Sequence, residues 1–216
     1  VGAAGSPVRK VIVKSSAHVY GANKEDPTFF REETPRSRSP RTNLERSLTE
    51  VEAFLSDFAE DNPHVCVTLL RFASVLGPDI ETPFTQALRR RLVPEILGFD
   101  HRMQFVHEDD VVNALMYTTA NDVPGIYNVA GDGNIPWSEV CAIVGKRRIP
   151  LAPVLTNIAA EPLRIIGHTL PPETLGLLRY GRTLDNLRLK QAGFRYGYTT
   201  SGAVEAFARS LRLEDT

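Results

Sequence analysis

The sequence predicts an α/β protein built around a parallel β-sheet. Short β-branched runs alternate along the chain with stretches whose apolar residues recur every three or four positions. Strands that alternate with helices are typical of parallel sheets, because each parallel pair needs a crossover connection. The 216 residues are 42% hydrophobic and 24% charged, which is ordinary for a globular protein with one domain or a domain and a small lobe.

The first part of the chain supplies two expected strands with a long helix between them. Residues 10–16 form an apolar run that ends in two hydroxyl side chains, as a buried parallel strand would. Residues 22–43 are rich in Pro, Arg, Ser and Thr and indicate a surface loop. A helix over 44–61 follows, ended by Asn62-Pro63, and residues 65–72 form the second strand. The helix carries one apolar stripe, made of Leu44, Leu48, Val51, Leu55 and Phe58.

The remaining elements become increasingly helical towards the end of the chain. The expected order is a helix from Thr82 or Pro83 to about Leu92, a strand near 104–107, a helix near 109–119, a strand at 126–130, a helix over 136–144, two helices within 157–179, and helices near 185–192 and 200–212. Because strands become scarce after residue 131, that stretch is expected to form a helical lobe over the carboxyl edge of the sheet. Open α/β sheets bind ligands along this edge.

Charge and cysteine content exclude some classes of function. The chain has 25 basic and 26 acidic residues, which gives no electrostatic reason to expect nucleic acid or an anionic membrane as partner. Cys66 and Cys141 each have apolar neighbours and fit buried thiols in a reducing compartment, without a metal-binding spacing. No apolar run approaches the roughly 20 residues of a membrane helix, and no signal-peptide pattern opens the chain. The expectation is therefore a cytoplasmic protein without a metal.

Five segments, in order, carry a resemblance to a known family. They are Ser15–Gly21 (S-S-x-x-V-Y-G), Leu70–Pro78 (L-R-[YF]-x-N-x-x-G-P), Phe105–Val111 (F-V-H-V-x-D-V), Gly125–Val129 (G-x-[YF]-N-[VI]) and Leu184–Phe194 (D-x-x-[KR]-x-x-x-L-G-[FW]). Together the chain resembles an extended short-chain dehydrogenase/reductase of the sugar-nucleotide epimerase/dehydratase class, similar to UDP-glucose 4-epimerases. The resemblance implies the C-terminal part of a Rossmann-like, doubly wound parallel sheet plus a small, mostly helical substrate lobe. It places the sheet in 1–80 and 105–130 and the lobe in 81–104 and 131–216.

Two hallmarks of that family are missing from the sequence. The strand, Gly-rich turn and helix that hold the dinucleotide pyrophosphate lie roughly a hundred residues before the first of the five segments in family members, and no such turn stands here. Family members also carry Y-x-x-x-K in the helix after the long loop, where the tyrosine transfers a proton and the lysine lowers its pKa. In the register set by Ser47 and Glu52, these positions hold Leu44 and Leu48, which extend the apolar stripe.

The resemblance nevertheless marks candidate site residues. Ser16 occupies the position of the family's catalytic hydroxyl, and His18 is a candidate base that would titrate near neutral pH. Ser15, Phe72 and Ala73 are the candidate contacts of NAD or NADP, while Ser74 and Arg102 are the candidate contacts of the substrate.

By the same resemblance, other positions indicate structural roles or disfavour dehydration. Ala17 and His18 stand where dehydratases carry an Asp-Glu pair, which disfavours dehydration. Tyr20 and Lys24 match Y-x-x-x-K by letter, but they begin a loop and are not expected to act as a pair. Met103 replaces an arginine that often binds diphosphate in the family. His107, Asp109 and Trp137 are expected to be structural.

Three interpretations stay open at this point. The chain belongs to an NAD-dependent nucleotide-sugar epimerase that is inactive or degenerate as written; it is a non-catalytic ligand sensor or scaffold on the same fold; or it is a fragment without a function of its own. Family dimers usually form through the helix that carries Y-x-x-x-K, so a homodimer through residues 44–61 is an open alternative to packing of the stripe on its own sheet. A fragment would leave a sheet edge and an apolar helix face uncovered.

Overall fold

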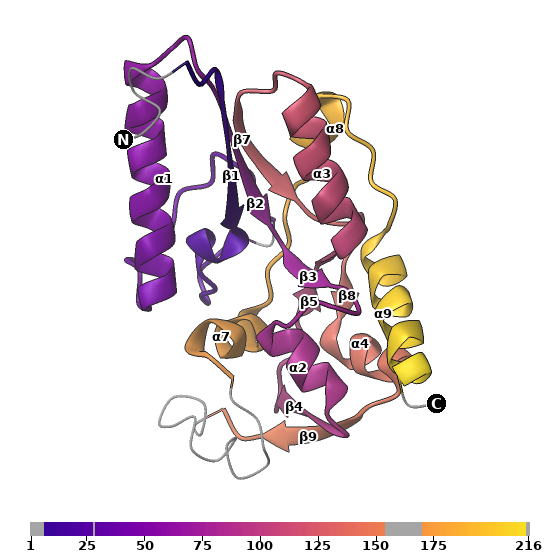
Figure 1. Cartoon of the computed structure of the whole chain (residues 1–216). Coiled ribbons are helices and arrows are strands. Elements are labelled where there is room, and N and C mark those ends of the chain that lie inside the picture. The colour runs from indigo at the N-terminus through magenta and orange to yellow at the C-terminus, as the bar shows by residue number, and fades with distance from the viewer. Residues whose placement is uncertain (1–6, 28, 154–169, 215–216) are drawn as a thin grey trace.

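The centre of the molecule is a three-stranded parallel sheet. In this computed structural model, which describes residues 7–27, 29–153 and 170–214, strands β1 (Lys10–Ser16), β2 (Cys66–Phe72) and β7 (Gly125–Val129) pair in the order β1-β2-β7. Helix α1 (Asn43–Asp61) lies on one side of this sheet and α3 (Glu108–Ala120) on the other (Figure 1). Helix α8 (Leu187–Gln191) contacts β7. The predicted α/β class with parallel strands is confirmed.

Local sequence signals explain where the two long helices begin. The side chain of Thr42 accepts a hydrogen bond from the backbone N–H of Glu45 at 3.2 Å, so a Thr-x-x-Glu pattern starts α1. Helix α3 starts after His107, whose Nδ1 accepts the backbone N–H of Asp109 at 3.1 Å. The ring of His107 also stacks on Tyr198 with the centroids 3.8 Å apart. His107 and Asp109 are therefore structural, as the sequence predicted.

A second set of elements, most of them from the predicted lobe, lies beyond the carboxyl ends of the strands (Figure 1). Strand β3 (Ser74–Leu76) pairs with β6 (Phe105–His107) and β4 (Leu92–Ile96) with β9 (Arg147–Leu151), both in parallel, while β5 (Arg102–Met103) and β8 (Ile135–Pro136) are antiparallel. The helices are α2 (Pro83–Arg89), α4 (Trp137–Val144), α7 (Pro172–Tyr180) and α9 (Thr200–Glu214).

The lobe differs from the prediction in its strands. Helix α2 ends at Arg89, and Leu92, expected in the last turn of the helix, instead begins β4. Strand β9 crosses a stretch that was expected to be helical, so the expectation of few strands after residue 131 is wrong there. Each of the two strands contains a proline, which argues against a central strand, and their partners are more than fifty positions apart in the chain. Of the two helices expected within 157–179, α7 is described and residues 157–169 lie outside the described residues.

Two hydrophobic clusters hold these parts together. One surrounds Tyr20, Leu70 and Phe72 beside the sheet, and the other surrounds Phe105 and Trp137 in the lobe. Trp137 is 2% exposed and donates its indole N–H to the carbonyl of Pro94 at 3.0 Å, so its predicted role as a core anchor is confirmed. Both cysteines are free; Cys141 is buried as expected, whereas Cys66 is half-buried.

One side of the sheet is left open in the described part of the chain. Strand β1 is an edge strand, and Val11, Ile12 and Val13 in it are only half-buried. On α1, Leu44, Val51 and Phe54 are exposed to 45%, 47% and 51%. The expectation that the whole stripe packs on its own sheet therefore fails for Leu44 and Val51, while Leu48, Leu55 and Phe58 are partly buried.

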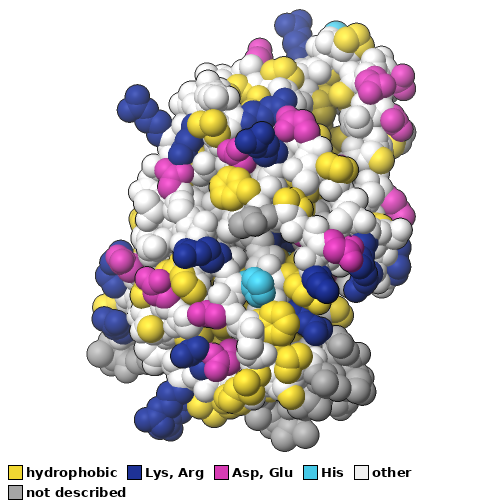
Figure 2. Space-filling view, turned by 180° about the vertical axis from the view of Figure 1, so that it is seen from behind, with side chains coloured by type: hydrophobic (Ala, Val, Ile, Leu, Met, Phe, Trp, Pro, Cys, Tyr) yellow, Lys and Arg dark blue, Asp and Glu magenta, His cyan; other side chains and the backbone are white. Residues whose placement is uncertain are grey.

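The surface shows no dominant charge on the face seen from behind. Figure 2 shows basic, acidic and apolar side chains interspersed there. Among the described residues, no helix is long and apolar enough to span a membrane. Within the same described ranges, no three His, Cys, Asp or Glu side chains come together as a metal site.

Candidate functional site

The candidate site lies where β1 ends and the short 3-10 helix η1 (Ala17–Tyr20) begins. The side chain of Ser16 caps η1: its Oγ lies 2.8 Å from Nδ1 of His18 and accepts the backbone N–H of His18 at 3.3 Å. Positive φ at Gly21 (+78°) turns the chain away from η1, and a Cβ there would come within 2.9 Å of Arg36 Nη2. Two of the predicted site residues, Ser16 and His18, are thus brought together.

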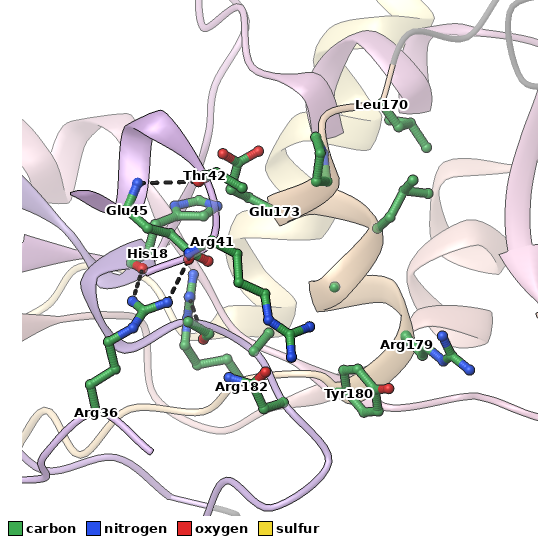
Figure 3. A pocket seen from close by; sticks show the side chains of 16 residues that line it. His18, Arg36, Arg41, Thr42, Glu45, Leu170, Glu173, Arg179, Tyr180 and Arg182 are labelled. Atoms are coloured by element: carbon green, nitrogen blue, oxygen red, sulfur yellow. Dashed lines mark hydrogen bonds and ion pairs between the residues drawn. The ribbon is translucent and has the colours of Figure 1, made fainter. Parts of the chain in front are cut away.

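A pocket of about 380 Å³ opens beside this pair. Its walls are η1, the loop that follows, the first turn of α1, and α7; Figure 3 shows His18 and Glu45 on one side and Arg179 and Tyr180 on the other. A second cavity of about 670 Å³ shares Arg179, Tyr180 and Arg182 with it. The size and the position at the carboxyl edge of the sheet are those of a small-molecule site.

The other predicted site residues fall into three places. Arg102 lines the second cavity, and its neighbour Met103 is 2% exposed and points into the core, as alternation along a strand predicts. Ala73 and Ser74 line a narrow space of about 10 Å³. Arg182 also lines that space, so this residue touches all three cavities.

Two of the predicted cofactor contacts, Ser15 and Phe72, lie in the interior. Ser15 donates its hydroxyl to Oε1 of Glu52 at 2.6 Å, and Phe72 is 3% exposed within the cluster around Tyr20. Neither side chain lines any of these three cavities. The structure therefore does not bring these two residues to the site, because the hydroxyl and the ring are both used to hold the sheet.

His18 is a weak base near neutral pH in this structure. Burial, and in second place the positive charge of Arg182, lower the pKa of His18 to about 3. The imidazole is therefore neutral at pH 7, and its protonated form is unstable. The expectation that His18 titrates near neutrality is wrong, since the sequence did not show how deeply the lobe covers η1.

Leu44 and Leu48 lie on α1 but do not line the pocket. Leu48 packs against the cluster around Tyr20, so its predicted conversion to a packing residue is supported. Leu44 is 45% exposed, so it does not pack on its own sheet, and the alternative of an interface with a second copy stays a prediction. Neither side chain has a group that transfers a proton.

The pocket contains charged residues that sequence reasoning missed. On the α1 side, Arg36 Nη2 donates to Glu45 Oε2 at 2.5 Å, and the backbone N–H of Arg41 donates to the same oxygen at 2.8 Å. Arg36 also donates to the carbonyl of Val19 at 2.6 Å, which ties the loop to η1. The Thr-x-x-Glu capping pattern was the available signal for Glu45; Arg182 had no comparable signal.

A buried polar network supports the site from below. Arg71 Nη2 donates to Glu52 Oε2 at 2.6 Å, and Arg71 Nη1 donates to the hydroxyl of Tyr20 at 2.7 Å. That hydroxyl donates in turn to Oδ1 of Asn128 at 2.8 Å. Tyr20 is therefore fixed in the interior while Lys24 is exposed, which supports the prediction that the two do not act as a pair.

The parallel sheet and its flanking helices define an α/β protein with a Rossmann-like fold. Residues 2–130 match the family described as the NAD dependent epimerase/dehydratase family. The chain belongs to this family.

Similar proteins include solved structures that share the fold, and they are longer than this chain. An uncharacterized protein of Mycobacterium tuberculosis is 32% identical over 209 residues, which cover 95% of this chain and 55% of the relative. Among solved structures, UDP-glucuronic acid 4-epimerase from Bacillus cereus in complex with NAD has a TM-score of 0.68 at 14% identity, covering 96% of this chain and 62% of that one. A dTDP-glucose 4,6-dehydratase from Bacillus anthracis in complex with NAD has a TM-score of 0.67 at 16% identity, covering 95% and 62%. The chain thus spans about half the length of its curated relatives.

The described residues do not by themselves form a cradle for NAD. Of the three predicted contacts, Ala73 alone reaches a cavity, and that cavity holds about 10 Å³. The 216 residues also contain no Gly-rich turn between a strand and a helix for the pyrophosphate.

Proposed function

We propose that this chain forms the substrate-binding side of an NAD-dependent epimerase/dehydratase-type protein that binds a nucleotide sugar but has lost the family's proton-transfer pair. The observation that carries the proposal is the composition of the site beside Ser16. The positions of the tyrosine and lysine hold Leu44 and Leu48, and His18 has a pKa of about 3. General acid–base help is worth roughly 10²–10⁴-fold in rate, so its loss leaves binding without efficient hydride chemistry.

The geometry supports binding because the pocket remains open and polar. It lies at the carboxyl edge of the sheet and is lined by His18, the hydrogen-bond partner of Ser16, and its walls come from both the sheet region and the lobe. We accordingly propose that residues 1–80 and 105–130 act as the sheet domain and 81–104 and 131–216 as the substrate lobe. The uncovered edge of β1 and the exposed apolar residues of α1 are suited to cover by a dinucleotide-binding half or by a second copy of the chain.

Residual epimerase activity is the second candidate. Glu45 is an acid in the wall of the pocket, and it would have to replace the missing tyrosine. Its Oε2 is occupied by Arg36 and by the backbone of Arg41, which opposes proton exchange. The non-catalytic interpretation is therefore preferred, with NAD bound by the rest of a longer protein and a cytoplasmic location as further parts of the proposal.

The experiment uses the full-length natural protein with UDP-glucose and UDP-glucuronic acid. Titration calorimetry measures binding, and NMR of the sugar measures formation of the 4-epimer. We expect binding without epimer in the wild type. Epimer formation by the wild type at rates ordinary for an enzyme would overturn the proposal.

Matched variants separate loss of the pair from loss of the pocket. Leu44→Tyr with Leu48→Lys restores both groups, and Leu44→Phe with Leu48→Met is the control of similar size. Epimer formed by the first variant alone means that the pocket is intact and only the pair was lost. No epimer from either variant means that the pocket has also diverged, which strengthens the sensor or scaffold interpretation.

A further inference from the structure

Two basic runs that are far apart in the sequence meet at one end of a strand pair in the lobe. The first run, Arg89–Arg91, ends α2 and leads into β4, and the second, Lys146–Arg148, leads from α4 into β9. Strands β4 and β9 pair in parallel with Leu92 opposite Arg147, so both runs lie at the starting end of the pair. Because neighbouring strands are only about 4.8 Å apart, the two runs form one cluster of positive charge.

Four of these six basic side chains have no acidic partner within the described ranges. They are Arg90, Arg91, Lys146 and Arg147, which form a basic rim. Lys146 is half-buried and the other three are exposed. The remaining two are engaged, since Arg148 forms an ion pair with Glu95 at 2.5 Å and Arg89 donates to the carbonyl of Pro78.

The basic rim is separate from the candidate site. Strands β4 and β9 run along the lower edge of the molecule in Figure 1, below the β1-β2-β7 sheet. None of the four rim residues lines any of the three cavities. Binding of a nucleotide sugar therefore gives no reason for this concentration of charge.

An apolar side chain stands within the basic rim. Leu92 follows Arg91 directly, lies opposite Arg147 in the strand pair and is 40% exposed. Residues 89–92 and 145–148 contain no aromatic side chain on which a nucleic-acid base could stack. Cations around an exposed aliphatic side chain match the boundary between anionic headgroups and acyl chains.

We propose that the basic rim is a docking surface for an anionic phospholipid bilayer. The whole chain has 25 basic and 26 acidic residues, but that balance does not show the rim, because its two halves are more than fifty positions apart. At physiological salt the Debye length is about 8 Å, so the local cluster decides the interaction with a charged surface. The inference does not depend on the proposed function.

Co-sedimentation with vesicles tests the proposal on the full-length natural protein. The vesicles contain phosphatidylcholine alone or phosphatidylcholine with about 30% phosphatidylglycerol, an anionic lipid. We expect binding to the phosphatidylglycerol vesicles only, and loss of this binding when NaCl is raised from about 0.1 M to about 0.5 M. Equal binding to both kinds of vesicle, or to neither, would overturn the proposal.

A charge-matched control separates the rim from the total charge. Arg90→Gln with Arg91→Gln removes two rim cations, and Arg9→Gln with Arg195→Gln removes two exposed cations elsewhere. We expect the rim variant to bind the anionic vesicles about 25-fold more weakly, or about fivefold for each charge, and the control to bind like the wild type. An equal loss in both variants would mean that no particular surface docks, and the proposal would fail.

The other half of the rim repeats the comparison. If Arg90→Gln with Arg91→Gln does not fold, Lys146→Gln with Arg147→Gln carries the test, and unchanged vesicle binding by that variant overturns the proposal. A short DNA duplex, followed by fluorescence polarisation at the same salt, covers the competing polyanion. Tighter binding of the duplex than of the vesicles, lost in the rim variants, would assign the surface to nucleic acid and overturn the lipid assignment.

Discussion

Replacing Glu52 by alanine is expected to destabilise the protein severely. Glu52 is the carboxylate of the buried network: it accepts the hydroxyl of Ser15 at 2.6 Å and both Nε and Nη2 of Arg71, the latter at 2.6 Å. The side chains of Glu52 and Arg71 are 8% and 10% exposed. Removing one partner of such a pair leaves a buried charge unpaired, which costs about 3–5 kcal/mol.

The assay is urea unfolding of the full-length protein followed by circular dichroism. The control is Glu50→Ala, an exposed position on the same helix, where a change within about 0.5 kcal/mol is expected. The double variant Glu52→Leu with Arg71→Met should lose much less than the sum of its single variants, because neither charge is then left alone. A loss below about 1 kcal/mol for Glu52→Ala would refute the reasoning, since it would mean that water reaches the pair.

Three further predictions follow from the same structure. Since its pKa is lowered to about 3, His18 stays neutral in the fold while the unfolded chain gains a proton below pH 6.5, so His18 should make stability fall by up to about 1.4 kcal/mol per pH unit on acidification. In urea titrations from pH 6.5 to 5, His18→Asn should lessen the slope by that share, while His101 and His107, whose pKa values burial also lowers, keep theirs. Trp137→Phe should cost about 1–3 kcal/mol, because the carbonyl of Pro94 loses its donor, and a neutral result would contradict the buried hydrogen bond. Gly181→Ala should destabilise far more than Gly98→Ala: both have positive φ, but a Cβ at Gly181 would lie 2.6 Å from the carbonyl of Arg102, whereas that at Gly98 meets nothing within 4 Å; equal melting temperatures would refute this packing.

The sheet could be predicted from the sequence because the pattern of its strands is local. Both β1 and β2 contain a short apolar, partly β-branched run, and each is followed by a turn or helix signal. The order of five short motifs along the chain then predicted the family to which the chain belongs. The pair β4 and β9 was missed because each strand contains a proline and depends on a partner more than fifty positions away.

Only part of the candidate site could be predicted, because the rest depends on segments that are distant in the chain. Ser16 and His18 were found from a local motif, but the pocket is completed by Arg182, which approaches from a distant segment. The lowered pKa of His18 is also a tertiary effect, since it comes from burial under the lobe and from Arg182. Leu44 and Leu48 were assigned by register alone, and their different exposure shows that one replaced residue joined the core and the other did not.

A single-turnover experiment tests most directly the proposal that the protein binds its nucleotide sugar without efficient hydride chemistry. Full-length protein loaded with NAD is mixed with an excess of UDP-glucuronic acid, and the absorbance of reduced nicotinamide is followed under conditions in which calorimetry shows the site to be filled. We predict no reduced nicotinamide above the level of a nucleotide-sugar-free control, because Leu44 and Leu48 offer no group to take the proton. Rapid formation of one reduced nicotinamide per site would contradict the claim and would show that another residue of the pocket transfers the proton.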